Sequence, residues 1–461
     1  MLAYSSIMRL YSIKNFFNRH WHLLALNLFW YLSLYPGRLG FDNALALKMI
    51  REGESTDWWT GTFWRVLQLT TLNGETIALL SLLQITLLAL SMYYFVGSLT
   101  KLDTVLAKRS LFLFTLTPIY GFFALSISHD VFQTSALLLM IGYFIRLRDK
   151  ITSGFAIEVL LLLLIVLCIS MVKTGIFFII ILIIAITIYG SNSKLKVPIV
   201  LISSIILLFL PAKGLDSSWT QSGKFTPFLG DMKCIAQHPD STISIETWNF
   251  LESIASKEAW TSPVSCSGLE AAVETLKPRF ATMTLDTEFL RNYLKMVYLN
   301  PEIFLMGHIV RSREALPPLL FPIPENQVSF DFSQPLGKDT NSALQSGPPL
   351  LHPSIDSPEL DQRVSLMKPL EVIAQFPAFL VNQASWFWGW AGFWLVVALL
   401  SSIKLKLFKN SSTMLFSFLP LLLLHLLIVA IGFNPQGRHL MASIFVGLYL
   451  GIYSLAKYLK T

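Results

Sequence analysis

Repeated apolar runs long enough to cross a lipid bilayer constrain this chain more than any other feature of its sequence. A helix that spans the hydrocarbon core needs about 20 apolar residues, within a range of roughly 17–25. Runs near this length occur at 20–36, 76–98, 110–128, 131–147, 154–172, 174–190, 196–213, 386–403, 412–432 and 440–458. The sequence therefore predicts an all-α polytopic membrane protein with about ten transmembrane helices.

Composition supports the membrane class. Hydrophobic residues make up 54% of the 461 residues and charged residues only 14%, whereas soluble domains carry about 25% charged residues. The formal net charge is +7, but the basic residues stand in short clusters between apolar runs, a pattern typical of topology control. We therefore expect membrane lipids, and no nucleic acid, as partners.

The basic residues also predict the orientation in the membrane. Lys and Arg near helix ends are retained on the cytoplasmic side, and alternate loops divide them sixteen to six. The rich set comprises Arg9, Lys14, Arg19, Lys101, Lys108, Arg109, Arg146, Arg148, Lys150, Lys194, Lys196, Lys404, Lys406, Lys409, Lys457 and Lys460; the poor set comprises Arg38, Lys48, Arg51, Arg65, Lys173 and Arg438. We expect a multi-pass protein of the cell inner membrane with both termini cytoplasmic.

This orientation divides the chain into three parts and places two long segments outside. The parts are an N-terminal membrane module at 1–213, an extracytoplasmic domain at 214–385 and a C-terminal membrane module of about three helices at 386–461. The outside segments are the domain, predicted to be mostly helical from spacing such as that of 287–313, and the loop 37–75. Two short helices in that loop, with tryptophans suited to the headgroup zone, are expected to lie in the membrane plane.

Three cysteines divide between these parts. Cys168 falls within an apolar run, whereas Cys234 and Cys266 both fall in the outside domain. An oxidising compartment permits a disulfide between the latter two, and the sequence alone does not decide whether it forms. No Cys/His cluster has zinc spacing.

Ionisable residues at the outer ends of membrane helices are candidates for function because they are costly to place there. Asp42, Asp57 and Asp130 each precede or open a helix, so each has an alternative role as a helix N-cap. His129 stands beside Asp130. Lys173 and Arg438, the latter followed by His439, are outside cations that can bind a lipid phosphate or make ordinary headgroup contacts. His425 lies inside an apolar run and is expected to be a hydrogen-bonded core residue.

Four segments together resemble the GT-C superfamily of membrane glycosyltransferases, which use polyprenyl-phosphate-linked sugars. They are "YPGRLGFD" at 35–42, "SHDVFQTSALLLMIGYF" at 128–144, "MVKTGIF" at 171–177 and "NPQGRHLMASIFVGLYL" at 434–450. Relatives commonly have Lys-Asp where this chain has His129-Asp130, and Asp-x-His-Pro where it has "DWWTG". The resemblance implies a GT-C-like fold with two interfacial helices in the first external loop, and a catalytic base at the position of Asp42.

On this resemblance, the expected activity is inverting transfer of a sugar from a polyprenyl-phosphate donor to a glycan, lipid or protein hydroxyl on the extracytoplasmic side. Asp42 is the expected general base, and Asp57, His129, Asp130, Lys173, Arg438 and His439 are the expected substrate-binding residues. A divalent cation is compatible with Asp42 and Asp130, but the sequence requires none. Two alternatives stay open: a lipid-linked oligosaccharide polymerase or ligase, and a transporter or flippase.

Overall fold

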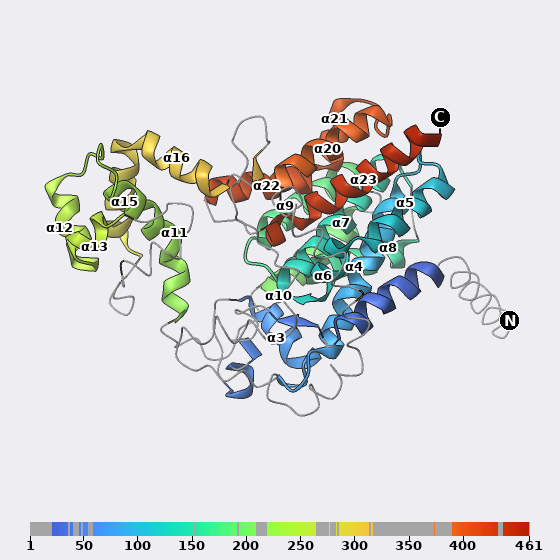
Figure 1. Cartoon of the computed structure of the whole chain (residues 1–461), viewed down its shortest axis with the longest axis horizontal. Helices are drawn as coiled ribbons and strands as arrows, with labels where there is room; N and C mark the ends of the chain where they lie inside the picture. Colours follow the sequence, from blue (N-terminus) through green and yellow to red (C-terminus); the bar gives the residue numbers. More distant parts are fainter. Residues whose placement is uncertain are drawn as a thin grey trace.

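The computed structural model of the chain is almost entirely helical (Figure 1). It describes residues 21–35, 37–39, 46–47, 49–53, 59–151, 154–190, 193–208, 219–263, 276, 283, 285–312, 315–316, 373, 390–431 and 437–460. A helix at 21–33 comes first. The helices of the first half that follow are α3 (Gly61–Thr70), α4 (Ala78–Ser98), α5 (Thr104–Leu116), α6 (Pro118–Leu125), α7 (His129–Arg148), α8 (Phe155–Ile169), α9 (Gly175–Tyr189) and α10 (Ser193–Leu208).

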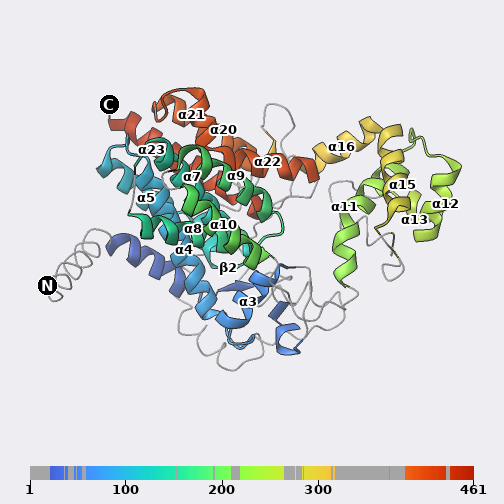
Figure 2. The same cartoon turned by 180° about the vertical axis from the view of Figure 1, so that it is seen from behind.

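The second half contains a small helical unit followed by the last helices of the bundle. The unit comprises α11 (Trp219–Ala236), α12 (Ile245–Ile254), α13 (Lys257–Thr261), α15 (Thr287–Leu299) and α16 (Pro301–Ser312). The bundle resumes with α20 (Ala391–Lys404), α21 (Ser411–Ser417), α22 (Leu419–Ile431), the 3-10 turn η3 (Gly437–Leu440) and α23 (Met441–Lys460). Figure 2 shows the unit standing to one side of the bundle, with its helix α16 next to α22.

Within the described residues, three helices are long and apolar enough to cross a membrane: α4, α7 and α23. The prediction of an all-helical chain with helices apolar enough to span a membrane is confirmed; the number of ten spans stays a prediction. Two predicted runs are not single straight helices. The run at 110–128 breaks at Thr117, where Pro118 opens α6, because proline lacks the N–H that a continuing helix needs. The run at 412–432 bends by 67° between α21 and α22, and counts as a fourth span only if the bent pair is one span.

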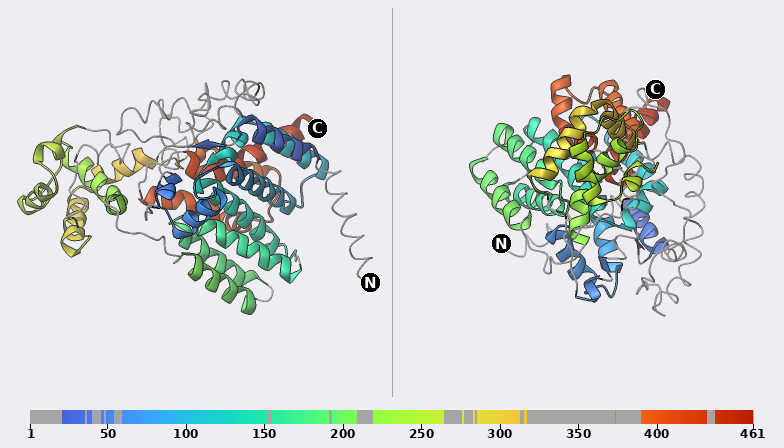
Figure 3. Two further views of the ribbon diagram at one scale, coloured as in Figure 1. Left: turned by 90° about the horizontal axis from the view of Figure 1, so that it is seen from below. Right: turned by 90° about the vertical axis from the view of Figure 1, so that its left-hand side faces the viewer.

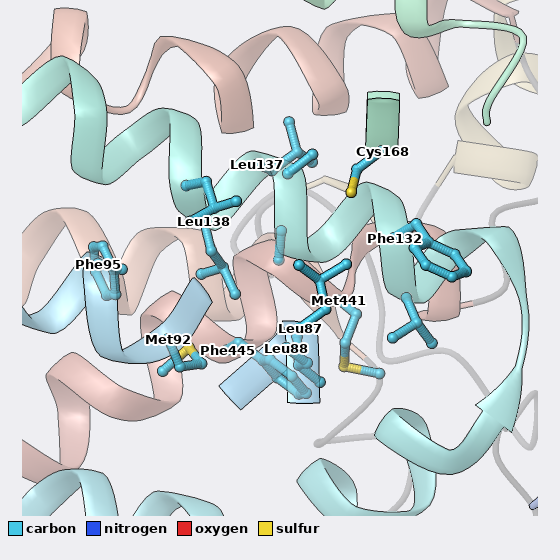
Figure 4. Packing of buried hydrophobic residues seen from close by; sticks show 14 of the residues in the cluster. Leu87, Leu88, Met92, Phe95, Phe132, Leu137, Leu138, Cys168, Met441 and Phe445 are labelled. Atoms are coloured by element: carbon cyan, nitrogen blue, oxygen red, sulfur yellow. The ribbon is translucent and has the colours of Figure 1, made fainter. Parts of the chain in front are cut away.

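Helix α7 lies at the centre of the bundle. It packs against α4, α8, α9, α21, α22 and α23, and nearly all of its length is buried. Figure 4 shows the side chains that fill this core, contributed by α4, α7, α8 and α23. On α23, Phe445 places its ring 5.1 Å from that of Phe114 and 5.5 Å from that of Phe123. This packing joins the C-terminal helix to helices from the first third of the chain.

The small helical unit has a core of its own. Buried apolar side chains from α11, α12, α13 and α15 form a cluster separate from that of the bundle. Trp260 is fully buried there and donates its indole N–H to the carbonyl of Leu251 at 2.8 Å. Figure 3 shows the unit beyond one end of the bundle, with the N-terminal helix towards the other end.

Basic loops meet at one end of the bundle. Lys101, after α4, donates to the carbonyl of Lys406, after α20, at 3.2 Å. The backbone N–H of Asp103 donates to the hydroxyl of Tyr453 in α23 at 2.9 Å, and Arg148, at the end of α7, reaches Ser417 of α21 at 3.4 Å. We call this the basic end. Helix α7 begins at the opposite end.

Candidate functional site

The segment that follows the helix at 21–33 is joined to the start of α7 by a short parallel β-pair. Strand β1 (Arg38–Leu39) pairs with β2 (Ser126–Ile127), so that Arg38 faces Ser126 and Leu39 faces Ile127. Gly37 leads into β1 with φ +131°, and a Cβ there would lie 2.1 Å from Ser81 Oγ. Only glycine fits such a position without strain. The chain just before Asp42 is thereby held against the segment that leads into Ser128.

Helix α7 is capped by Ser128. Its hydroxyl oxygen accepts from the backbone N–H of Asp130 at 3.1 Å, and its O–H donates to Asp130 Oδ2 at 2.7 Å. Gln84 of α4 donates from Nε2 to the Ser128 carbonyl at 2.7 Å. The reading of Asp130 as the N-cap is therefore wrong, since serine already fills that position and places Asp130 in the first turn.

Asp130 instead binds a histidine from the other end of the chain. His439 Nδ1 lies 2.9 Å from Asp130 Oδ1, and His129 Nε2 lies 3.6 Å from the same oxygen. Asp130 is 1% exposed whereas the His439 side chain is 17% exposed. A carboxylate only accepts hydrogen bonds, so His439 donates from Nδ1. The buried carboxylate thus orients an imidazole whose edge still reaches the surface.

Helix α3, in the 37–75 segment, packs beside His129, the neighbour of Asp130. Helix α3 places the ring of Phe63 5.5 Å from that of His129, and Thr62 donates its hydroxyl to the carbonyl of Leu207 at the end of α10. The N-cap of α3 is Thr60, whose side chain accepts from the N–H of Phe63. The alternative of Asp57 as the N-cap of this helix is therefore wrong.

Three of the predicted site residues come together in the described part of the chain: His129, Asp130 and His439. Asp42 and Asp57 lie outside the described residues. Arg438 lies in η3, next to His439, with only its backbone described. Lys173 is exposed on the turn between α8 and α9. Helix connectivity puts this turn at the same end of the bundle as the start of α7.

Sequence reasoning missed Ser128 and Gln84, which hold Asp130 in place. The signal for Ser128 was present, since serine immediately before an apolar helical run is a preferred N-cap. Gln84 carries no such signal, because it is one polar residue within the apolar run of α4. Only the packing of α4 against β2 brings it to the Ser128 carbonyl.

Other predictions concern residues away from this site. His425 is a hydrogen-bonded core residue, as expected: Nδ1 lies 2.7 Å from the Ala315 carbonyl and Nε2 lies 2.8 Å from Ser443 Oγ. Cys168 is a free buried thiol. Cys234 is disulfide-bonded, and Cys266 lies outside the described residues.

A bound metal would need several ligands close together. Among the residues that the structure describes, no group of three or more His, Cys, Asp or Glu side chains is arranged to hold a metal ion. The described site therefore consists of one buried carboxylate, two histidines, a serine hydroxyl and an aromatic ring.

Comparisons of the chain with protein-family models, with curated proteins and with solved structures found no match.

Proposed function

We propose that the protein transfers a sugar from a polyprenyl-phosphate donor to an acceptor hydroxyl at the membrane end that contains Asp130 and His439. One observation carries the proposal: segments picked out by sequence as functional, although far apart in the chain, meet at this end. The β1–β2 pair brings Arg38 and Leu39, three to four positions before Asp42 in the chain, beside β2 and just before Ser128, and Asp130 binds His439, the neighbour of Arg438. The basic loops gather at the opposite end.

The proposed orientation follows from those two ends. Loops rich in Lys and Arg remain cytoplasmic, so the basic end faces the cytoplasm and the Asp130 end faces the extracytoplasmic side. We infer that the shorter apolar helices complete about ten spans in a GT-C-like arrangement. The small helical unit formed by α11–α13, α15 and α16 then belongs to an extracytoplasmic domain.

In the proposed reaction, the acceptor oxygen attacks the anomeric carbon as its bond to the donor phosphate breaks, which inverts the configuration. Asp42 takes the proton of the acceptor hydroxyl, a role worth about 10²–10⁴-fold in rate. The lipid phosphate leaves as an anion, so it needs charge stabilisation more than protonation. Arg438, with Lys173 as a helper, supplies that charge.

The histidines have a different role from Asp130. Asp130 is too buried to touch a substrate, so we assign it as a positioning residue that acts through His439. His439 and His129 are the groups at this site with exposed imidazole surface, and we assign them to substrate binding. Asp57, in the same external loop, stays a predicted substrate contact.

The test uses purified full-length protein in lipid nanodiscs with a panel of radiolabelled polyprenyl-phosphate sugars and membrane-lipid acceptors. Transfer of label to an acceptor with inverted configuration is the expected result. Transfer only from diphosphate-linked glycans would replace the proposal with a polymerase or ligase. In a parallel assay with the protein in sealed vesicles, movement of label across the membrane without any product would replace it with a transporter.

A further inference from the structure

Helix α16 of the small helical unit is joined to the end of the apolar helix α22 through two polar side chains one turn apart. His308 Nδ1 lies 3.3 Å from the carbonyl oxygen of Val429, and the Ser312 hydroxyl donates to the carbonyl of Ile428 at 3.4 Å. Both carbonyls belong to the last four residues of α22. The carbonyl groups of the last four residues of a helix accept no hydrogen bond from within that helix. Helix α16 therefore caps α22 from outside.

The other nitrogen of His308 faces a buried carboxylate. His308 Nε2 lies 3.1 Å from Asp231 Oδ1 on α11, and both side chains are more than nine-tenths buried. The same carboxylate accepts from the Arg311 guanidinium and, at 2.9 Å, from the Tyr293 hydroxyl of α15. His308 thus stands between the interior of the small helical unit and the end of α22.

The hydrogen-bond chemistry of these two partners fixes what His308 must be. A backbone carbonyl and a carboxylate both accept and never donate, and a neutral imidazole has one N–H whereas an imidazolium has two. His308 can satisfy Val429 and Asp231 together only when it is protonated. His425 differs, because its second partner, the Ser443 hydroxyl, can donate to a neutral ring.

We propose that His308 is a proton-dependent latch that docks the small helical unit onto the end of α22. The protonated ring makes both bonds; loss of the proton removes one and weakens docking. Histidine commonly gains or loses its proton between about pH 5 and 8, so docking should be tight in acid and loose in base. The proposal does not depend on the transfer reaction.

Titratable or charged side chains face His308 from α11 and α16, and α15 contributes one to the same cluster. Helix α11 contributes Asp231, α15 contributes Tyr293 and α16 itself contributes Arg311; the contacts from α22 are backbone carbonyls. Burial, and next the charge of Asp231, raise the pKa of Tyr293, which keeps that hydroxyl a neutral donor. Arginine stays charged. His308 is therefore the described group at this junction whose two hydrogen bonds depend on its own protonation.

The latch lies close in the chain to the candidate site. Helix α22 leads through the 432–436 segment to η3, which contains Arg438 and His439. Val429, which His308 contacts, thus precedes His439 by ten positions in the chain. Docking of the small helical unit offers a way for outside acidity to act on that site.

The experiment measures the distance between the small helical unit and the bundle as a function of pH. Spin labels are attached to cysteines introduced at two exposed positions, Asn249→Cys on α12 and Thr100→Cys after α4, in full-length protein in nanodiscs. Cys168 is buried and free, and Cys234 is already in a disulfide, so neither takes the label. Electron–electron double resonance then gives the distance distribution between pH 5.5 and 8.5.

We expect one narrow distance at acidic pH and a second, broader population at basic pH. The ratio of loose to docked protein should rise roughly tenfold, as for the loss of one charged hydrogen bond. His308→Gln should abolish this pH dependence. Ser312→Ala, which removes a bond that does not titrate, should loosen docking at every pH but keep the dependence, and His238→Gln, an exposed histidine of the same unit, should change nothing.

A distance distribution that stays the same across this pH range in the unsubstituted protein overturns the latch. Should His308→Gln fail to fold, that measurement and the Ser312→Ala series still decide the question. A pH response that persists undiminished in folded His308→Gln protein assigns the switch to another group and also overturns the proposal.

Discussion

His439 Nδ1 donates to Asp130 Oδ1 across 2.9 Å, although the two residues are separated by 309 positions in the chain. The bond ties the turn before the last helix to the first turn of the central helix. It also fixes which ring nitrogen of His439 carries a proton, since the carboxylate can only accept. When the His439 ring is neutral, Nε2 is therefore the nitrogen that has no proton.

Asp130→Asn should disturb the orientation of His439 while keeping a side chain of the same size at position 130. The amide can donate as well as accept, so the proton on Nδ1 is no longer imposed, and we expect the rate of sugar transfer to fall roughly 10²-fold. Nitrogen-15 NMR of histidine-labelled protein, assigned with His439→Gln, reports the tautomer directly. Asp149→Asn, at the other end of α7, is the matched control and should leave both readouts unchanged. An unaltered His439 spectrum in Asp130→Asn would refute the positioning role.

Asp42→Asn should abolish most transfer if Asp42 accepts the proton from the acceptor. The amide cannot act as a base, and we expect a loss of about 10²–10⁴-fold in kcat with correct membrane insertion retained. Glu75→Gln, an exposed carboxylate in the same 37–75 segment, should keep normal turnover. Near-normal turnover in Asp42→Asn would remove Asp42 from the chemistry and favour the polymerase or ligase alternative.

Gly37→Ala should destabilise the junction between the first loop and α7. Alanine is strained at φ +131°, and its Cβ would meet Ser81 Oγ and lie 3.3 Å from the Leu125 carbonyl. We expect a loss of about 1–3 kcal/mol in the free energy of unfolding, measured by denaturant unfolding in detergent. Gly97→Ala, in a helical position with open space around it, should instead stabilise the protein by up to about 1 kcal/mol. Equal effects of the two substitutions would contradict this account of Gly37.

A buried ion pair between α8 and α10 should be sensitive to the loss of either partner. Lys196 donates to Glu158, with the two side chains 1% and 9% exposed. Glu158→Gln leaves the ammonium buried without its counter-charge and should cost about 3–5 kcal/mol of unfolding free energy. The double variant Glu158→Leu with Lys196→Met should recover most of that stability.

The control for that experiment is an exposed ion pair. Lys295 and Glu246 form one on the small helical unit, and Glu246→Gln should leave stability within error, because solvent screens such pairs. A Glu158→Gln variant as stable as the control would show that the buried pair contributes nothing.

Several features of the fold could be predicted from short stretches of sequence. The apolar runs predict α4, α7 and α23 directly, because a helix that long and that apolar is most stable in lipid. The spacing in 287–313 predicts helix there, and the structure divides this stretch into α15 and α16. Helix ends were less predictable: the run at 110–128 divides into α5 and α6, with Pro118 opening the second helix, and Thr60, not Asp57, caps α3.

The candidate site could be predicted only as separate parts. Residue type alone marked His129, Asp130 and His439, since ionisable groups at the ends of membrane helices are costly. Their contact could not be read from the chain, because it depends on how α23 packs against α7. The same holds for Gln84, an isolated polar residue that packing brings to the Ser128 carbonyl, and for Lys196, which composition assigned to a loop and tertiary structure buries against Glu158.

Hydrophobicity and charge along the chain thus determined that this protein is helical and apolar enough for a membrane, and which residues are chemically unusual there. Those properties are local, so a single sequence displays them. The tertiary structure alone decided that Asp130 binds His439 and that His308 joins Asp231 to the end of α22. Such contacts form only when helices distant in the chain pack into one core. The free energy that favours them comes from the packing of all these helices together, so no single segment of sequence displays it.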